Sequence, residues 1–199
     1  MERKAAFLVL GNALIAGGSR LSASTTPRLA RPAMRAIPML RDAGFGFVVV
    51  AHAPGIALGD LSEDDLILVG RRLEEALAQL GATLTGFYYC PHHPSGKLPA
   101  YAVDCVCRPP QPGLITKAAS ELGFDLSASW VIAEVLDGVE AGRRAGCRTV
   151  LIDTGSEMDW RITRYRVPHY LTGDLAKAAR VIVAAERKWP VETGGQQVS

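Results

Sequence analysis

The chain of 199 residues has little net charge and no long apolar run. Its formal charge of +2 is too small to indicate a nucleic-acid partner. The arginines at 161, 164 and 166 are spaced among apolar residues, which favours a solvated face. None of the apolar segments reaches the roughly 18 residues that a membrane span needs, and segment 5–10 is too short for the core of a secretory signal. We therefore expect a cytoplasmic protein that binds neither nucleic acid nor a membrane.

The residues that are present indicate one α/β domain. Hydrophobic residues make up 48% of the chain, and its length suffices for a single domain with a sizeable core. Short apolar runs alternate with helical patterns, which is typical of a parallel sheet covered by helices on both faces. The pattern predicts strands at 5–10, 45–51, 84–89, 130–134, 149–153 and 169–172, and helices at 32–43, 62–80, 113–122, 136–145 and 174–186.

The predicted fold is a Rossmann-like three-layer α/β/α domain with a mainly parallel sheet and no large cap domain. It spans residues 1–189 and is followed by a polar tail at 190–199. A polar loop rich in glycine, serine and threonine occupies 17–26. Ser62 is expected to cap its helix, because acidic residues fill the first turn behind it, and Gly81 is expected to end that helix.

The four cysteines indicate metal binding, since a reducing compartment disfavours disulfides. Cys90 and His92 precede the segment 93–104, and Cys105 and Cys107 follow it. Three sulfurs and one imidazole nitrogen form a set that tetrahedral Zn²⁺ prefers. The loop 90–107 is polar and proline-rich, so it cannot bury enough apolar surface to order itself, and a structural zinc ion would supply the missing free energy.

Other interpretations of these side chains remain open at this stage. His93 is an alternative ligand to its neighbour His92, although the Cys-x-His spacing favours His92. Cys105 and Cys107 would otherwise be packed or oxidised thiols. Cys147 lies at a helix-to-strand turn and is expected to be an ordinary buried thiol.

Several motifs occur in the order found in one known family. They are Gly-Ile-Ala-x-Gly at 55–59, Cys-Pro-His at 90–92 with Cys-x-Cys-Arg at 105–108, Pro-x-Pro-Gly-Leu at 110–114, Asp-x-x-x-Ala-Gly at 137–142 and Ala-Gly at 145–146. From Ala5 to about Glu186 the chain resembles the histidinol-phosphate and D,D-heptose 1,7-bisphosphate phosphatases of the haloacid dehalogenase superfamily. The resemblance implies that the cysteine–histidine loop carries a structural zinc and helps to shape the substrate pocket.

The same resemblance implies where catalytic groups should lie. In the family, an aspartate at the tip of the first strand attacks phosphorus, and a second one two residues later acts as acid and base. A hydroxyl after the second strand and a lysine hold the phosphoryl group. In this chain Val9 stands at the position of the nucleophile, Gly11 at that of the acid/base and Ala51 at that of the hydroxyl. No shifted alignment restores a carboxylate, because no acidic residue lies between Glu2 and Asp42.

The positions after the fourth strand are altered as well. The family's Mg²⁺-binding aspartate becomes Ala133, and its lysine becomes Glu134. Asp137 remains as the one retained acid of that group, and Arg108 remains as a candidate substrate-binding residue. Loss of a nucleophile typically costs about a millionfold in turnover, or roughly 8 kcal/mol. The sequence therefore predicts a lost Mg²⁺ site and a catalytically inactive, phosphatase-like protein with a structural zinc.

Such a pseudoenzyme would act as a binding, regulatory or assembly subunit, with a protein partner or a phosphorylated sugar as ligand, in sugar-phosphate or heptose metabolism. The expected cleft is apolar, or filled as extra core, and its residues are Val9, Leu10, Ala13, Ala51, Pro54 and Ile132. The alternative is a sugar-phosphate phosphatase of the heptose-bisphosphate type with rearranged catalytic residues. Its candidates are His52, as nucleophile or base, with Arg108, Glu134 and Asp137. A third hypothesis is a purely structural subunit of a larger assembly.

Overall fold

The computed structural model describes residues 3–17 and 27–188. Most of the predicted loop 17–26 and the whole predicted tail 190–199 lie outside these residues. Within the described part of the chain, no helix has both the length and the apolar character that a membrane crossing requires.

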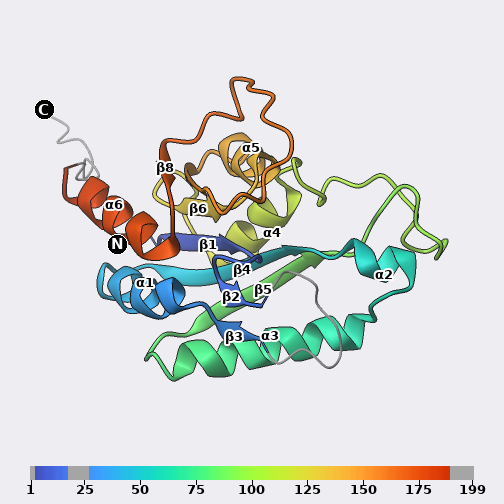
Figure 1. Ribbon diagram of the computed structural model, residues 1–199, viewed down its shortest axis with the longest axis horizontal. Coiled ribbons are helices and arrows are strands. Elements are labelled where there is room, and N and C mark those ends of the chain that lie inside the picture. Colours follow the sequence, from blue (N-terminus) through green and yellow to red (C-terminus); the bar gives the residue numbers. More distant parts are fainter. Residues whose placement is uncertain (1–2, 18–26, 189–199) are drawn as a thin grey trace, which may run out of the picture.

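A six-stranded sheet forms the centre of the structure (Figure 1), in the order β5-β4-β1-β6-β7-β8. Every neighbouring pair of strands in it is parallel. The strands are β1 (Ala5–Val9), β4 (Gly46–His52), β5 (Leu84–Cys90), β6 (Trp130–Ala133), β7 (Arg148–Ile152) and β8 (Tyr170–Thr172). Central strand β1 is apolar without alternation because both of its faces are covered, as its buried Phe7 and Leu8 show.

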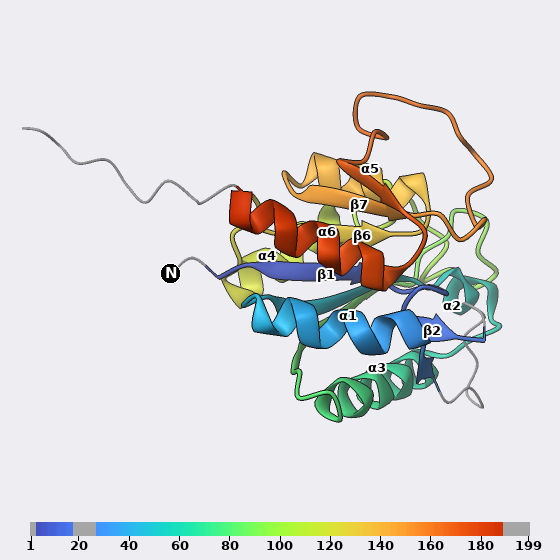
Figure 2. The same ribbon diagram turned by 60° about the vertical axis from the view of Figure 1, so that its left-hand side comes forward.

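Helices cover both faces of the sheet. Leu8 packs in one core cluster with residues of α1 (Arg31–Asp42), α3 (Glu63–Ala78) and α6 (Leu175–Lys188). Phe7 packs in a second cluster with residues of α4 (Gly113–Leu122) and α5 (Leu136–Arg144). Helices α1 and α6 lie side by side in Figure 2. The fold is therefore the predicted Rossmann-like α/β/α arrangement.

Helix α3 begins as its sequence predicts. The Ser62 hydroxyl accepts a hydrogen bond from the Asp65 backbone N–H at 3.1 Å, and the Asp65 carboxylate accepts one from the Ser62 backbone N–H at 3.0 Å. This reciprocal capping satisfies two donors that a helix start leaves free. Hydrogen bonds donated to the Asp65 carboxylate by the Ser62 hydroxyl and by the Ser62 backbone N–H lower the pKa of Asp65. Gly81 adopts a left-handed conformation just after the helix, as expected for a stop.

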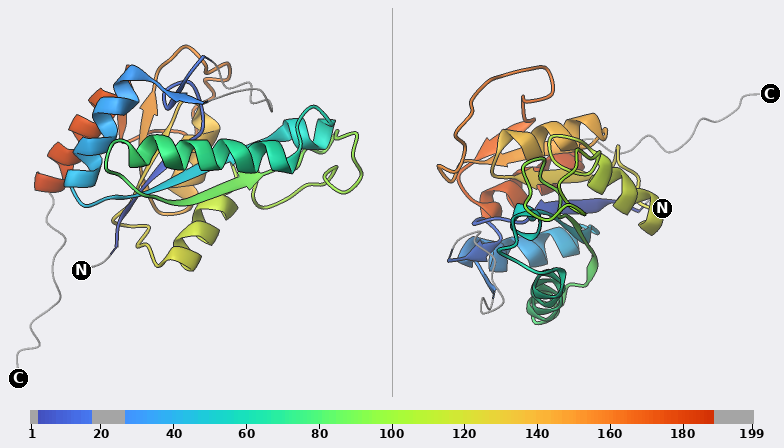
Figure 3. Two further views of the ribbon diagram at one scale, coloured as in Figure 1. Left: turned by 90° about the horizontal axis from the view of Figure 1, so that it is seen from below. Right: turned by 90° about the vertical axis from the view of Figure 1, so that its right-hand side faces the viewer.

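Three short elements were not predicted: α2 (Pro54–Leu58) and the antiparallel pair of β2 (Ile15–Ala16) and β3 (Arg28–Leu29). Elements of two to five residues carry too little periodicity to be recognised. Helix α2 and the loop 91–112 project together beyond the carboxyl ends of β4 and β5 (Figure 3). The Ala57 carbonyl joins them by accepting hydrogen bonds from the N–H groups of Lys97 and Leu98.

Gly142 is a point of close approach between α5 and the sheet. A Cβ at this position would lie 2.7 Å from Val131 Cβ and 2.9 Å from Thr149 Cγ2, so the Ala141-Gly142 motif is a packing requirement. We expect Gly142→Ala to cost about 1–3 kcal/mol through overpacking. That cost corresponds to an unfolding temperature lower by roughly 3–10 °C, measurable by differential scanning calorimetry.

Gly173→Ala is the matched control. Its added Cβ would meet only the flexible Lys177 Nζ, at 3.6 Å, and its backbone is not left-handed. Its unfolding temperature should stay within about 2 °C of wild type, as is usual for surface changes of up to about 0.5 kcal/mol. Equal effects of the two substitutions would show that α5 does not pack as closely as described.

Candidate functional site

The predicted metal ligands come together at the carboxyl end of β5. Cys90 ends that strand, and the loop after it brings His92, Cys105 and Cys107 beside it, with all four ligand atoms within 4.8 Å of one another. Cys107 Sγ lies 3.1 Å from Cys90 Sγ and 3.2 Å from Cys105 Sγ, and His92 Nδ1 lies 3.3 Å from Cys107 Sγ. A zinc tetrahedron with bonds of about 2.3 Å has sulfur–sulfur edges of roughly 3.8 Å. The residues therefore fit a tetrahedral metal ion after a small expansion.

The other two candidates lie apart from this cluster. The His93 Nδ1 atom accepts a hydrogen bond from the Ser95 backbone N–H at 3.1 Å. Cys147 is buried in the core cluster beneath α4 and α5, and that burial raises the pKa of its thiol to about 12. It is thus an inert thiol of the kind predicted from its position.

The cluster is tied directly to the start of α4. The Gly113 N–H donates to the Val106 carbonyl at 3.0 Å, and a side chain on Gly113 would overlap that carbonyl. The fourth residue of the Pro-x-Pro-Gly-Leu motif is therefore glycine, because the ligand segment passes against it. Metal binding and the position of α4 are linked by this contact.

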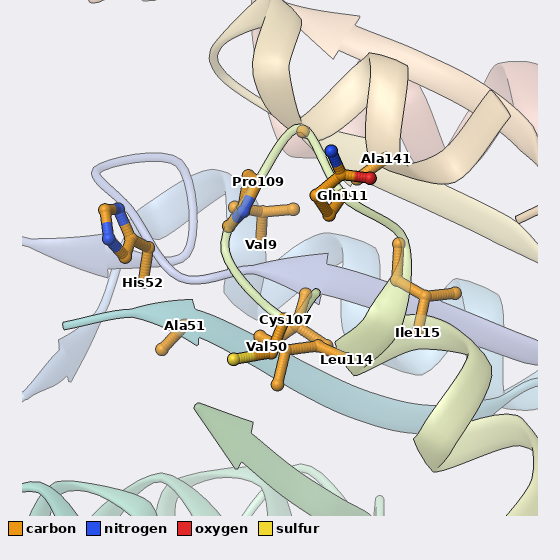
Figure 4. A pocket seen from close by; sticks show the side chains of 11 residues that line it. Val9, Val50, Ala51, His52, Cys107, Pro109, Gln111, Leu114, Ile115 and Ala141 are labelled. Carbon is orange, nitrogen blue, oxygen red and sulfur yellow. The ribbon is translucent and has the colours of Figure 1, made fainter. Parts of the chain in front are cut away.

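At the tip of β1, the cleft expected to be apolar is a small cavity of about 20 Å³. Figure 4 shows apolar side chains from several elements facing it, with His52 at the margin of the group. The lining includes Val9, Ala51, Cys107, Pro109, Leu114 and Ile115. Such a volume holds about one water and cannot hold a sugar phosphate.

Four of the six residues predicted to line one cleft lie around two small cavities. Ala51 lines the first cavity, Ala13 and Ile132 line a second one of about 10 Å³, and Val9 lines both. Leu10 and Pro54 line neither of the two, which corrects the prediction for these residues. Ala51 and Ile132 are buried, and the partly buried Val9, Leu10 and Ala13 pack against the core clusters, so little free volume remains around these side chains.

Glu134 reaches from the end of β6 to the loop after β1. Its Oε1 accepts a hydrogen bond from the Ala13 backbone N–H at 2.5 Å, and its Oε2 accepts one from the Thr154 hydroxyl at 2.9 Å. Any Cβ on residue 11 would overlap the Glu134 carboxylate. A buried carboxylate thus occupies the space that an acid/base side chain at position 11 would need.

Asp137 is paired with an arginine from the segment between β7 and β8. Arg166 Nη1 donates to Asp137 Oδ1 at 2.6 Å and lies 3.7 Å from Glu140 Oε2. The Arg166 side chain is 9% exposed, so it is buried rather than on the solvated face that its sequence neighbourhood suggested. Arg161 and Arg164 are exposed as expected.

A magnesium site of the family's kind does not fit these residues. Val9 and Ala133 offer no side-chain oxygen, and the Asp137 carboxylate is engaged by a guanidinium. Mg²⁺ needs oxygen ligands at about 2.0–2.1 Å in an octahedral arrangement. Neither Glu134 nor Asp137 is free to supply one without losing the partners described above.

His52, at the end of β4, and Arg108, just after the metal loop, each have a partner in that loop. The His52 Nε2 atom lies 3.4 Å from the His92 carbonyl oxygen. Partial desolvation by surrounding protein atoms lowers the pKa of the His52 imidazole, although the side chain remains partly exposed to solvent. The Arg108 guanidinium lies 3.8 Å from the Asp104 carboxylate. Neither contacts Glu134 or Asp137 through a hydrogen bond or ion pair within the described residues.

Sequence reasoning missed the partners supplied by the segment 153–169. Thr154, Glu157 and Arg166 contact the β6–α5 turn from an irregular stretch with no helical or strand period. The one available signal is the high density of charged residues between 157 and 166, which a solvated face explains equally well.

Known proteins provide independent comparisons. A family model described as HAD-hydrolase-like matches residues 106–178. The chain is 35% identical over 117 residues to the D-glycero-beta-D-manno-heptose-1,7-bisphosphate 7-phosphatase of Yersinia pestis, covering 58% of this chain and 62% of that protein. It is 37% identical over 123 residues to the phosphatase of the same name from Pasteurella multocida, covering 61% and 66%. The matched part thus spans less than two thirds of either relative.

Solved structures extend the likeness of the fold over nearly the whole chain. A protein of Mesorhizobium loti described as a HAD-like phosphatase superposes with a TM-score of 0.76 at 24% identity, covering 94% of this chain and 87% of that one. The D,D-heptose 1,7-bisphosphate phosphatase of B. bronchiseptica, complexed with magnesium and phosphate, superposes with a TM-score of 0.72 at 22% identity, covering 92% and 99%. The chain is therefore related in sequence to the heptose-bisphosphate phosphatases of the haloacid dehalogenase superfamily over about three fifths of its length, and it shares their fold over nearly all of it.

Proposed function

We propose that this protein is a phosphatase-like pseudoenzyme that binds or regulates a partner instead of hydrolysing a phosphate ester. One observation carries the proposal: the Glu134 carboxylate occupies the space at Gly11 and is held there by Ala13 and Thr154. A phosphate dianion approaching the tip of β1 would meet a fixed negative charge and no cation from Val9, Ala51 or Ala133. The site therefore opposes the charge that phosphoryl transfer needs it to stabilise.

The apolar surroundings of Val9 oppose phosphate binding for a second reason. Transfer of a charged group from water into an apolar cavity costs free energy unless the group is paired and hydrogen-bonded. Within the described residues that line the cavity at Val9, no lysine or arginine is present to provide that pairing. A partner protein would instead meet exposed apolar side chains, such as Val106 at 77% and Met158 at 91% exposure.

A second candidate function is a sugar-phosphate phosphatase with rearranged catalytic groups. The comparisons favour it, because the curated relatives named above are phosphatases. One geometric observation supports it too, since Glu134 brings a carboxylate within hydrogen-bonding distance of the loop after β1. In this candidate Glu134 would act as the base or nucleophile.

An assay against D-glycero-beta-D-manno-heptose 1,7-bisphosphate separates the two candidates. For the pseudoenzyme we expect kcat/KM at least about 10⁵-fold below that of the Yersinia pestis relative measured in parallel, because the nucleophile is missing. Addition of Mg²⁺ should leave the rate unchanged. Released phosphate is the measured quantity.

Glu134→Gln is the decisive variant in that assay. The amide keeps an oxygen that accepts from the Ala13 N–H but removes the carboxylate charge. Mg²⁺-stimulated phosphate release that wild type shows and Glu134→Gln loses would establish the second candidate and refute the pseudoenzyme. A rate equal in both proteins and in a mock purification supports the first.

We further propose that the cysteine–histidine cluster holds one structural Zn²⁺. The donor set of three thiolates and one imidazole is typical of closed structural zinc sites. A zinc-bound set of free thiols fits a reducing compartment, and we propose the cytoplasm as the location of the protein. The ion would hold the loop 90–107 against α2 and the start of α4.

Metal analysis of the purified protein tests this assignment. We expect close to one zinc per chain, lost in Cys105→Ser, together with an unfolding temperature lowered by on the order of 10 °C as a few kcal/mol of ligation disappear. Cys147→Ser is the control, because that thiol is buried away from the cluster. Equal zinc content in wild type and Cys105→Ser would contradict the assignment.

A further inference from the structure

Residues 153–169, which we call the strap, connect β7 to β8 without regular secondary structure and run against the β6–α5 turn. Near the start of the strap, the Thr154 hydroxyl donates to Glu134. In its middle, the Glu157 carboxylate accepts from the Leu136 backbone N–H at 2.5 Å and from the Asp159 N–H at 2.6 Å. The strap therefore supplies an anion to the first turn of α5, where the helix has N–H groups without intrahelical partners.

Near its end, the strap supplies a cation to the same turn. Arg166 donates to Asp137 at 2.6 Å and to the Asp159 carbonyl at 2.8 Å, which joins the strap to α5 and to itself. Glu140 lies 3.7 Å from Arg166 and accepts from Arg144 Nε at 2.8 Å. The Arg166 guanidinium is 9% exposed and balances the charge of the surrounding carboxylates. Removal of one member of such a buried charged group lowers the stability of the fold.

Burial of apolar side chains does not hold the strap in place. Met158 is 91% exposed, Trp160 52% and Ile162 61%. Apolar groups that face water contribute little to closure, since the hydrophobic effect scales with the area removed from water. The polar contacts of Thr154, Glu157 and Arg166 are therefore the main attachment of the strap to the β6–α5 turn.

We propose that the strap is a built-in closure of this site, in which Arg166 takes the position of a divalent cation beside Asp137. The site thus carries its own cation and its own anion, and needs neither Mg²⁺ nor phosphate to balance its charges. The inference shares one assumption with the proposed function, namely that the β6–α5 turn corresponds to the place where phosphatases of the family bind their metal. Opening of the strap would uncover Glu140 and separate the half-exposed Asp137 from its guanidinium partner.

The amide of Leu136 reports directly on closure, because Glu157 is its hydrogen-bond partner. In Arg166→Met, which keeps the length of the side chain and removes its charge, we expect Leu136 to exchange its amide hydrogen about tenfold faster or more. Amides of β1 and β4 should keep their wild-type rates. Residue-resolved hydrogen exchange by NMR on the full chain measures both.

Arg164→Met is the matched control, because Arg164 lies in the strap and is exposed, and its hydrogen bond and cation–π contact among the described residues are with the neighbouring Tyr165. It should leave Leu136 exchange unchanged. Asp137→Ala removes the partner of Arg166 from a half-exposed position and should accelerate Leu136 exchange even where Arg166→Met fails to fold. Unchanged exchange in Asp137→Ala, or equal acceleration in Arg164→Met, overturns the proposal.

Mn²⁺ is the probe for the cation position. With Mn²⁺ present at about 1 mM, paramagnetic broadening of the NMR signals around residue 137 should be the same in wild type and in Asp137→Ala. A weak carboxylate site would already be filled at this concentration. Broadening in wild type that depends on Asp137 means that Arg166 does not take the cation's place. Phosphatase activity is measured separately, so its presence would refute the proposed function without affecting this result.

Discussion

The electrostatics of this protein depend on one steric constraint, the close approach of Glu134 to Gly11. A side chain at residue 11 and a glutamate at residue 134 cannot occupy the same space, and two carboxylates there would also repel each other. The resemblance to heptose-bisphosphate phosphatases implies an aspartate at the first position and a lysine at the second. The two replacements are therefore sterically linked, because a side chain at residue 11 would require the Glu134 carboxylate to leave the position in which Ala13 and Thr154 hold it.

The rest of the site shows a related change. Charge partners that a phosphatase obtains from bound ligands are supplied here by residues of the chain itself. A phosphatase of this family balances its carboxylates with Mg²⁺ and its lysines with phosphate. Here Glu134 is satisfied by the Ala13 N–H and the Thr154 hydroxyl, and Asp137 by Arg166. The retained acid therefore gives no evidence of a retained metal site, because its partner has changed.

Much of the fold could be predicted from the sequence, since it depends on local patterns. The apolar run of β1, the serine cap of α3 and the glycine stop at 81 each follow from residues close together in the chain. The grouping of the two cysteine–histidine segments was predictable for the same reason, since the spacing within each segment is short. The Glu134 and Arg166 contacts were not, because their partners lie 121 and 29 residues away and one of them lies on an irregular segment. Periodicity carries no information about such pairs.

The cysteine–histidine loop has a structural role that does not depend on phosphatase chemistry. Cys107 lines the cavity at Val9, and Pro109, just beyond it in the chain, closes the same cavity. The loop also fixes the start of α4 through the close contact of Gly113 with Val106. A metal ion at this cluster would thus order side chains that cover an apolar core instead of a substrate. Loss of the ligands would expose Val9 and Leu114 to water, so stability alone is a sufficient physical reason to keep them.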